Sequence, residues 1–156
     1  MNKLTDIEIR VLHEALDDEY HAWAIYDQVI ADFGEVRPFI NIRQAEARHI
    51  EALLGLFARY GLPVPANQWP SKVERYTSLQ AACEAGVIAE IANGEMYERL
   101  LGQTQHNDIL TVLHHLQEAS QQRHLAAFQR CAQRGAGGDG GRGGRDGRGA
   151  GNRQGV

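Results

Sequence analysis

Five ionisable side chains lie in the middle of helical faces that are otherwise apolar, and their types are those of metal ligands. With consecutive residues placed ~100° apart around each helix, Glu19 and Glu90 each fall within an apolar arc. Glu46 and His49 share a third arc, and His124 lies in a fourth. An unpaired buried carboxylate is strongly unfavourable or is neutralised by a shift in its pKa. Since these arcs contain no Lys or Arg, the sequence predicts that a bound cation compensates the buried acids.

The spacing of these residues indicates one shared site. Glu46 and His49 are three residues apart, so both project from the same side of one helix. Glu19, His49 and Glu90 lie near the midpoints of their helices, and His124 lies roughly one turn past its own. Carboxylates with imidazole suit iron or manganese, and also zinc. Because carboxylates can bridge, we expect two metal ions rather than one.

Apolar residues recur at three- and four-residue spacing, which is typical of helices, and strand patterns are lacking. The pattern predicts four helices, over residues 6–31, 38–60, 78–101 and 108–133. Thr5 with Glu8, and Thr77 with Gln80, fit capping boxes at two helix starts. Gly102 fits a C-cap at the end of the third helix.

The connections predict how these helices are arranged. Residues 33–37 and 102–107 are short links, which join antiparallel neighbours. The link over 61–77 can span ~55 Å when extended at ~3.3 Å per residue, whereas a helix of this size is ~35 Å long at ~1.5 Å per residue. The sequence therefore predicts an all-α, antiparallel four-helix bundle with one long crossover between its second and third helices.

Glycine divides the 156-residue chain into two parts. Of its 17 Gly, eleven lie between Gly135 and Val156. The net charge of −4 divides into +2 for this segment and −6 for residues 1–134. We expect one acidic domain over 1–134 and a disordered tail over 135–156. The tail resembles Arg- and Gly-rich RNA-binding segments, but with four Arg and no aromatic residue we expect a soluble extension rather than nucleic-acid binding.

Other features exclude several classes of protein. No apolar run reaches the ~18 residues of a membrane span, and residues 1–8 show no secretory signal. Cys83 and Cys131 are too few for a disulfide scaffold and lie on apolar arcs, so we expect free buried thiols and a cytoplasmic location.

The set of candidate ligands, spread over four helices, resembles that of the ferritin-like superfamily, which includes rubrerythrins and bacterioferritins. Its usual set is one Glu from each of two helices and a Glu-x-x-His from each of the other two. The resemblance covers residues 5–133. The runs that begin at Glu46 and at His124 also resemble the uncharacterised ferritin-like domains designated DUF2202. The resemblance to the superfamily implies that two iron ions, with manganese or zinc as alternatives, are held by Glu19, Glu46, His49, Glu90 and His124. It also suggests assembly into homo-oligomers.

One position departs from the family pattern. Gln121 stands three residues before His124, where the family has a bridging Glu. The second metal ion could bind loosely, or the site could be mononuclear. We expect Gln121, Asn93 and Tyr26 to support the ligands by hydrogen bonds, and Gly86, which flanks Glu90 together with Gly94, to leave room for the metal centre.

The predicted metal site is consistent with two alternative functions. The resemblance implies a di-iron oxidoreductase acting on iron, oxygen or peroxide, like a ferroxidase or peroxidase. The alternative is a non-catalytic helical bundle with a degenerate or mononuclear metal site that serves assembly or binding.

Overall fold

The computed structural model describes residues 3–137, and within this range the chain is entirely helical, with no strand. This confirms the all-α class. The elements are α1 (Asp6–Phe33), α2 (Phe39–Arg59), α3 (Leu79–Leu101), α4 (Asn107–Ala119), the π-helical turn η1 (Ser120–His124) and α5 (Leu125–Gly137). Since α4, η1 and α5 follow one another without a break, they form the fourth helix of the bundle. Residues 138–156 of the expected tail lie outside the described residues.

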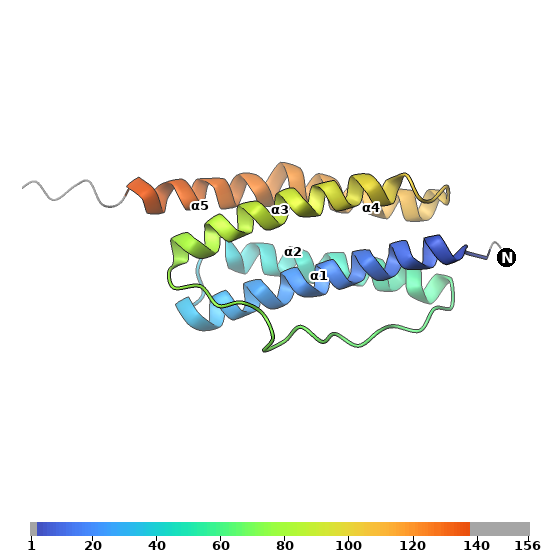
Figure 1. Ribbon diagram of the computed structural model, residues 1–156, viewed down its shortest axis with the longest axis horizontal. Helices are drawn as coiled ribbons and strands as arrows, with labels where there is room; N and C mark the ends of the chain where they lie inside the picture. Colours follow the sequence, from blue (N-terminus) through green and yellow to red (C-terminus); the bar gives the residue numbers. More distant parts are fainter. Residues whose placement is uncertain (1–2, 138–156) are drawn as a thin grey trace, which may run out of the picture.

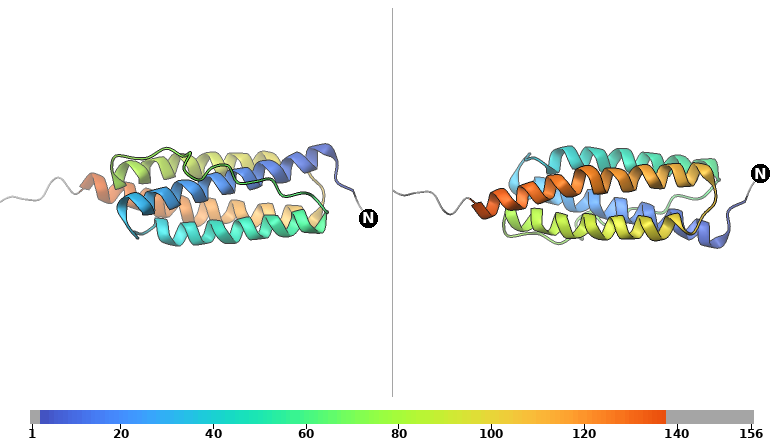
Figure 2. Two further views of the ribbon diagram at one scale, coloured as in Figure 1. Left: turned by 90° about the horizontal axis from the view of Figure 1, so that it is seen from below. Right: turned by 90° about the horizontal axis from the view of Figure 1, so that it is seen from above.

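The helices form two pairs (Figure 1). α1 lies beside α2 and runs in the opposite direction, and α3 is related in the same way to α4 and α5. The segment between α2 and α3 returns along the length of the bundle, and the views together place it beside α1 until it reaches the start of α3 (Figure 2).

The crossover is fastened to α1 by Trp69. Its indole Nε1 donates to Asp17 Oδ1 at 3.0 Å, and its ring stacks on His21 with 3.9 Å between centroids. Further along the crossover, Arg75 pairs with Asp32 of the same helix. These contacts hold a proline-containing segment that has no helix of its own.

Of the three helix caps predicted from the sequence, the structure contains two and replaces the third. The capping box of Thr5 and Glu8 is present, and Gly102 follows α3 as its C-cap. The capping box expected at Thr77 is wrong, because Ser78 has the extended backbone and its hydroxyl accepts from the amide of Ala81. A one-residue difference of this kind is decided by backbone conformation rather than by residue type.

The core consists of two apolar clusters, one toward each end of the bundle. The first packs residues 11–16 of α1 against Leu53, Phe57 and the start of α4. The second packs residues 26–30 of α1 against Phe39 and Phe128. Between these levels, along every helix, lies a layer of buried polar residues. The expected ionisable layer therefore lies between two apolar ends that shield it from solvent.

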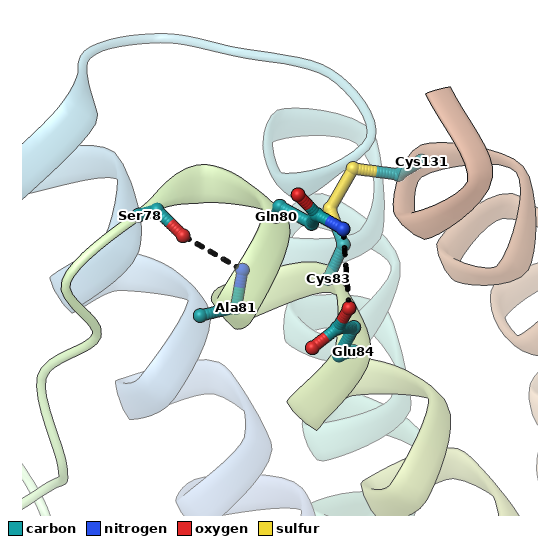
Figure 3. Close-up of a disulfide and its surroundings, with 6 residues drawn as sticks. All are labelled: Ser78, Gln80, Ala81, Cys83, Glu84 and Cys131. Carbon is teal, nitrogen blue, oxygen red and sulfur yellow. Dashed lines mark hydrogen bonds between the residues drawn. A yellow bond between two sulfur atoms is a disulfide. The ribbon is translucent and has the colours of Figure 1, made fainter. Parts of the chain in front are cut away.

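Cys83 and Cys131 form a disulfide that joins α3 to α5 (Figure 3), so the expectation of free thiols is wrong. Their Cα atoms are 5.8 Å apart, and 48 residues separate them in the sequence. The periodicity places each cysteine on a buried face, but it does not show that the two face each other.

The glycines of α3 leave room for neighbouring side chains rather than for a metal ion. A Cβ atom at Gly86 would lie 2.7 Å from the Phe128 ring, and one at Gly94 would overlap the Gln121 side chain. The expectation that Gly86 makes space for a metal centre is therefore wrong, because Phe128 fills that space.

Glu8 fastens the start of α1 to the α3–α4 connection, and we expect Glu8→Ala to lower the free energy of unfolding by ~2 kcal/mol. Its carboxylate accepts from the Thr5 amide at 3.0 Å and from Thr104 Oγ1 at 2.7 Å. Burial opposes its charge, but these hydrogen bonds outweigh burial and lower the pKa of Glu8 below 4.5. The contribution is therefore present above pH 4.5 and is lost as the pH falls through the lowered pKa. Urea unfolding at pH 7 and pH 3 measures it.

The exposed Glu51 of α2 provides the matched control for this prediction. Glu51→Ala should stay within ~0.5 kcal/mol of the wild type. A similar loss of stability in both variants, or an effect of Glu8→Ala that does not diminish as the pH falls below 4.5, would contradict the assignment.

Candidate metal centre

The five residues expected as ligands come together in the middle of the bundle. Their exposed fractions lie between 2% and 6%. They form two groups whose ligand atoms lie within 4.8 Å of one another, and each group could hold a metal ion. The groups are Glu19, Glu46 and His49, and then Glu46, Glu90 and His124.

Glu46 belongs to both groups because its two carboxylate oxygens face different histidines. Oε2 lies 3.1 Å from Nδ1 of His49, and Oε1 lies 3.2 Å from Nδ1 of His124. The two imidazole rings are nearly parallel, with their centroids 5.5 Å apart. A carboxylate placed between two imidazoles in this way can bridge two metal ions.

Glu19 and Glu90 complete the two groups from opposite sides. Glu19 Oε2 lies 3.6 Å from Nδ1 of His49. Glu90 Oε1 lies 3.5 Å from Nδ1 of His124. Each group thus offers one terminal carboxylate, one imidazole nitrogen and one oxygen of the shared Glu46, and leaves further coordination positions for water or a small molecule.

Burial and mutual contact shift the pKa values of these groups. Burial alone would lower the pKa of His49, but contacts with Glu19 and Glu46 raise it to about 9. Burial opposes the charge of His124 too, whereas Glu46 and Glu90 raise its pKa to about 10. Burial, together with the charge of Glu46, raises the pKa of Glu19 to about 8. Protonated imidazoles therefore supply positive charge beside the buried acids in the metal-free protein.

Two buried atoms of the layer have no hydrogen-bond partner within the described residues and belong to donor types that bind metal ions. Glu19 Oε2 and His124 Nδ1 are buried and make no hydrogen bond with any residue between 3 and 137. Buried polar atoms are seldom left without a partner. Both atoms belong to donor types that bind iron, manganese and zinc, so the residues present fit a metal ion.

Hydroxyl groups hold the terminal carboxylates in place. Tyr26 donates to Glu90 Oε1 at 2.9 Å, and Ser120 donates to Glu90 Oε2 at 2.5 Å. Tyr97 donates to Glu19. Burial, aided by the charge of the carboxylates, raises the pKa of both tyrosines well above 10. They therefore remain protonated donors that fix the orientation of the ligand oxygens.

The π-helical turn η1 carries His124, and the sequence pattern, which predicts an uninterrupted helix here, does not show it. Such turns occur frequently at functional sites. Gln121 lies in the same turn and donates from Nε2 to the backbone oxygen of Glu90 at 2.9 Å. It supports the helix that carries a ligand, and its amide nitrogen faces the backbone rather than the carboxylates.

Asn93 supports a residue that the sequence analysis did not single out. Its Nδ2 donates to Asp18 Oδ2 at 2.5 Å, and Asn93 has no hydrogen bond to any of the five ligands within the described residues. Burial raises the pKa of Asp18 to about 6. Asp18 directly precedes Glu19 and is off the centre of the apolar arc, so helical periodicity alone gave no signal for it.

Together, the fold and the site define a helical bundle with a buried carboxylate and imidazole layer that could hold metal ions. The fold is similar to the crystal structure of a hypothetical protein from Methanococcus jannaschii DSM 2661, with a TM-score of 0.78 and 21% sequence identity. The match covers 87% of this chain and 85% of that chain, and at this identity it shows the fold alone.

Comparison with models of known protein families and with curated proteins gives no match. Within residues 3–137, no helix is both long enough and apolar enough to cross a membrane.

Proposed function

We propose that this chain is a ferritin-like di-metal carboxylate protein, related to the DUF2202 domains, that uses two iron ions in redox chemistry with oxygen or peroxide. The observation that carries the proposal is the position of Glu46, whose two oxygens face two separate histidines. A mononuclear site has no need of a carboxylate shared between two complete sets of ligands. The crossover connection and the ligand spacing of the ferritin-like superfamily add to this argument.

Each residue then has a definite role. Glu46 would bridge the two metal ions, while His49 with Glu19 and His124 with Glu90 would hold one ion each. Two divalent cations balance the charge of three buried carboxylates, with one charge left for an anionic partner molecule. When bound, iron supplies electrons for the reduction of oxygen or peroxide. Tyr26 and Tyr97 orient the terminal carboxylates, and apolar clusters close the bundle core at both ends of the layer.

A second candidate is a mononuclear or non-catalytic site, and Gln121 favours it. Gln121 has an amide in place of a carboxylate, so it adds no third carboxylate to the group formed by Glu46, Glu90 and His124. Its amide instead donates to the backbone oxygen of Glu90. The affinity for the second ion is therefore expected to be lower than for the first.

Anaerobic titration with ferrous iron, followed by exposure to oxygen, tests the proposal. We expect about two irons per chain and a near-ultraviolet absorbance that develops only with oxygen. Elemental analysis near one iron per chain would favour the mononuclear alternative. Absence of bound iron, manganese and zinc in both the purified and the titrated protein would overturn the proposal.

A further inference from the structure

A groove of about 560 Å³ opens between α2 and the helix formed by α4, η1 and α5. Four alanines give it space, because Ala45 and Ala52 on α2 lie across from Ala119 and Ala127. Ile42 and Leu116 add apolar surface to the lining. The volume lies in the range of pockets that bind small organic molecules.

The groove leads to the candidate metal centre. His49 and His124 both belong to its lining, although only 6% and 4% of their surfaces are exposed. A molecule in the groove would therefore lie against the two imidazoles that hold the metal ions. The two other helices that carry candidate ligands, α1 with Glu19 and α3 with Glu90, contribute no residue to the lining of the groove.

The rim of the groove is cationic in a domain that is acidic overall. Arg48, Arg123 and Arg130 line it, whereas no Asp or Glu does. Among the described residues, these three arginines form no ion pair. Outside the groove, four guanidinium groups are paired with carboxylates, in Arg43–Asp27, Arg59–Asp108, Arg75–Asp32 and Arg99–Glu14, and three other described arginines, which are scattered along the chain, form no ion pair within residues 3–137. Unpaired guanidinium groups around a concave site attract anions and bind carboxylates through two parallel hydrogen bonds.

We propose that this groove binds a small amphipathic organic carboxylate, with its head group on Arg48, Arg123 and Arg130 and its apolar body on the alanine-lined floor. One part of the inference rests on the proposed function: the carboxylate in the groove would be a substrate or effector of the metal centre. The apolar floor argues against inorganic phosphate, for which it offers no donor. The small volume argues against a macromolecule as the occupant.

Calorimetric titration with n-octanoate tests the groove, and it is performed on both metal-free and iron-loaded protein. Octanoate should bind, and its neutral counterpart n-octanamide should bind at least about tenfold more weakly. Arg48→Gln with Arg123→Gln should weaken octanoate binding at least about tenfold, because charge-assisted hydrogen bonds are lost. Arg10→Gln with Lys72→Gln removes the same charge from exposed positions outside the groove and should leave the affinity unchanged.

The outcomes separate this proposal from the proposed function. Arginine-dependent octanoate binding by a protein that takes up no metal would keep the groove and overturn the di-metal centre. Two irons per chain without octanoate binding would support the di-metal centre and overturn the groove as a carboxylate site. Equal binding of octanamide, equal affinity in both double variants, or tighter binding of inorganic phosphate would overturn the groove as a carboxylate site. Far-ultraviolet circular dichroism and thermal melting show whether each variant is folded.

Discussion

Glu46→Ala should reduce metal content from about two ions per chain to nearly none, which no other single substitution in the layer is expected to do. Glu46 is the residue that both groups of ligands share, and one of its oxygens faces each histidine. Its removal leaves each ion with one carboxylate and one imidazole, which is too few for tight binding of iron in a closed site. Elemental analysis after iron titration and gel filtration measures the change.

Two further variants make this prediction specific. Glu19→Gln should lose only the ion held with His49, and Glu90→Gln only the ion held with His124, so each should retain about one ion. Glu51→Ala changes an exposed glutamate on the same helix as Glu46 and should retain both. Two ions bound by Glu46→Ala, or complete loss in Glu19→Gln alone, would contradict a bridging role.

The double variant Cys83→Ala/Cys131→Ala should unfold with a free energy about 4 kcal/mol lower than that of the oxidised wild type. The disulfide closes a segment with a sequence separation of 48 residues, and loop-closure entropy gives about this value for a loop of that length. The loop contains most of α3, all of α4 and η1 and the first half of α5, so without the bond the unfolded chain gains much conformational freedom. Urea unfolding of metal-free protein measures the difference without a contribution from bound ions.

Reduction of the wild type provides the control for this prediction. Wild-type protein treated with dithiothreitol should unfold at nearly the same urea concentration as the double variant. Thiol titration of the denatured, unreduced wild type should find no free thiols. A difference below ~1 kcal/mol, or two free thiols in protein purified without reductant, would contradict a stabilising disulfide.

Much of the local structure was predictable because it depends on interactions within one helix. The three- and four-residue spacing of apolar side chains predicted all four helices, and the capping box of Thr5 and Glu8 predicted the start of α1 to the residue. The burial of Glu19, Glu46 and Glu90 followed from the same spacing. A charged residue in the centre of an apolar face needs a compensating partner, so its position alone pointed to a site.

The features that the sequence did not reveal depend on contacts between helices. The hydrogen bond from Tyr97 to Glu19 joins residues 78 positions apart, and no local pattern predicts it. The π-helical turn inserts its extra residue within an otherwise regular apolar repeat, so helical periodicity continues through it unchanged. The partly buried Asp18 accepts a hydrogen bond from Asn93 of α3, a residue 75 positions away in the sequence.

The sequence by itself determined where the helices lie and that five ionisable side chains of the central layer are buried, because both follow from periodicity along one chain segment. Only the tertiary structure decided that one oxygen of Glu46 faces each histidine, that Cys83 faces Cys131, and that three arginines surround a groove beside the imidazoles. These arrangements depend on the rotation and axial offset of helices that are distant in sequence. Side-chain packing across the core fixes both quantities, and no single helix contains the information to set them.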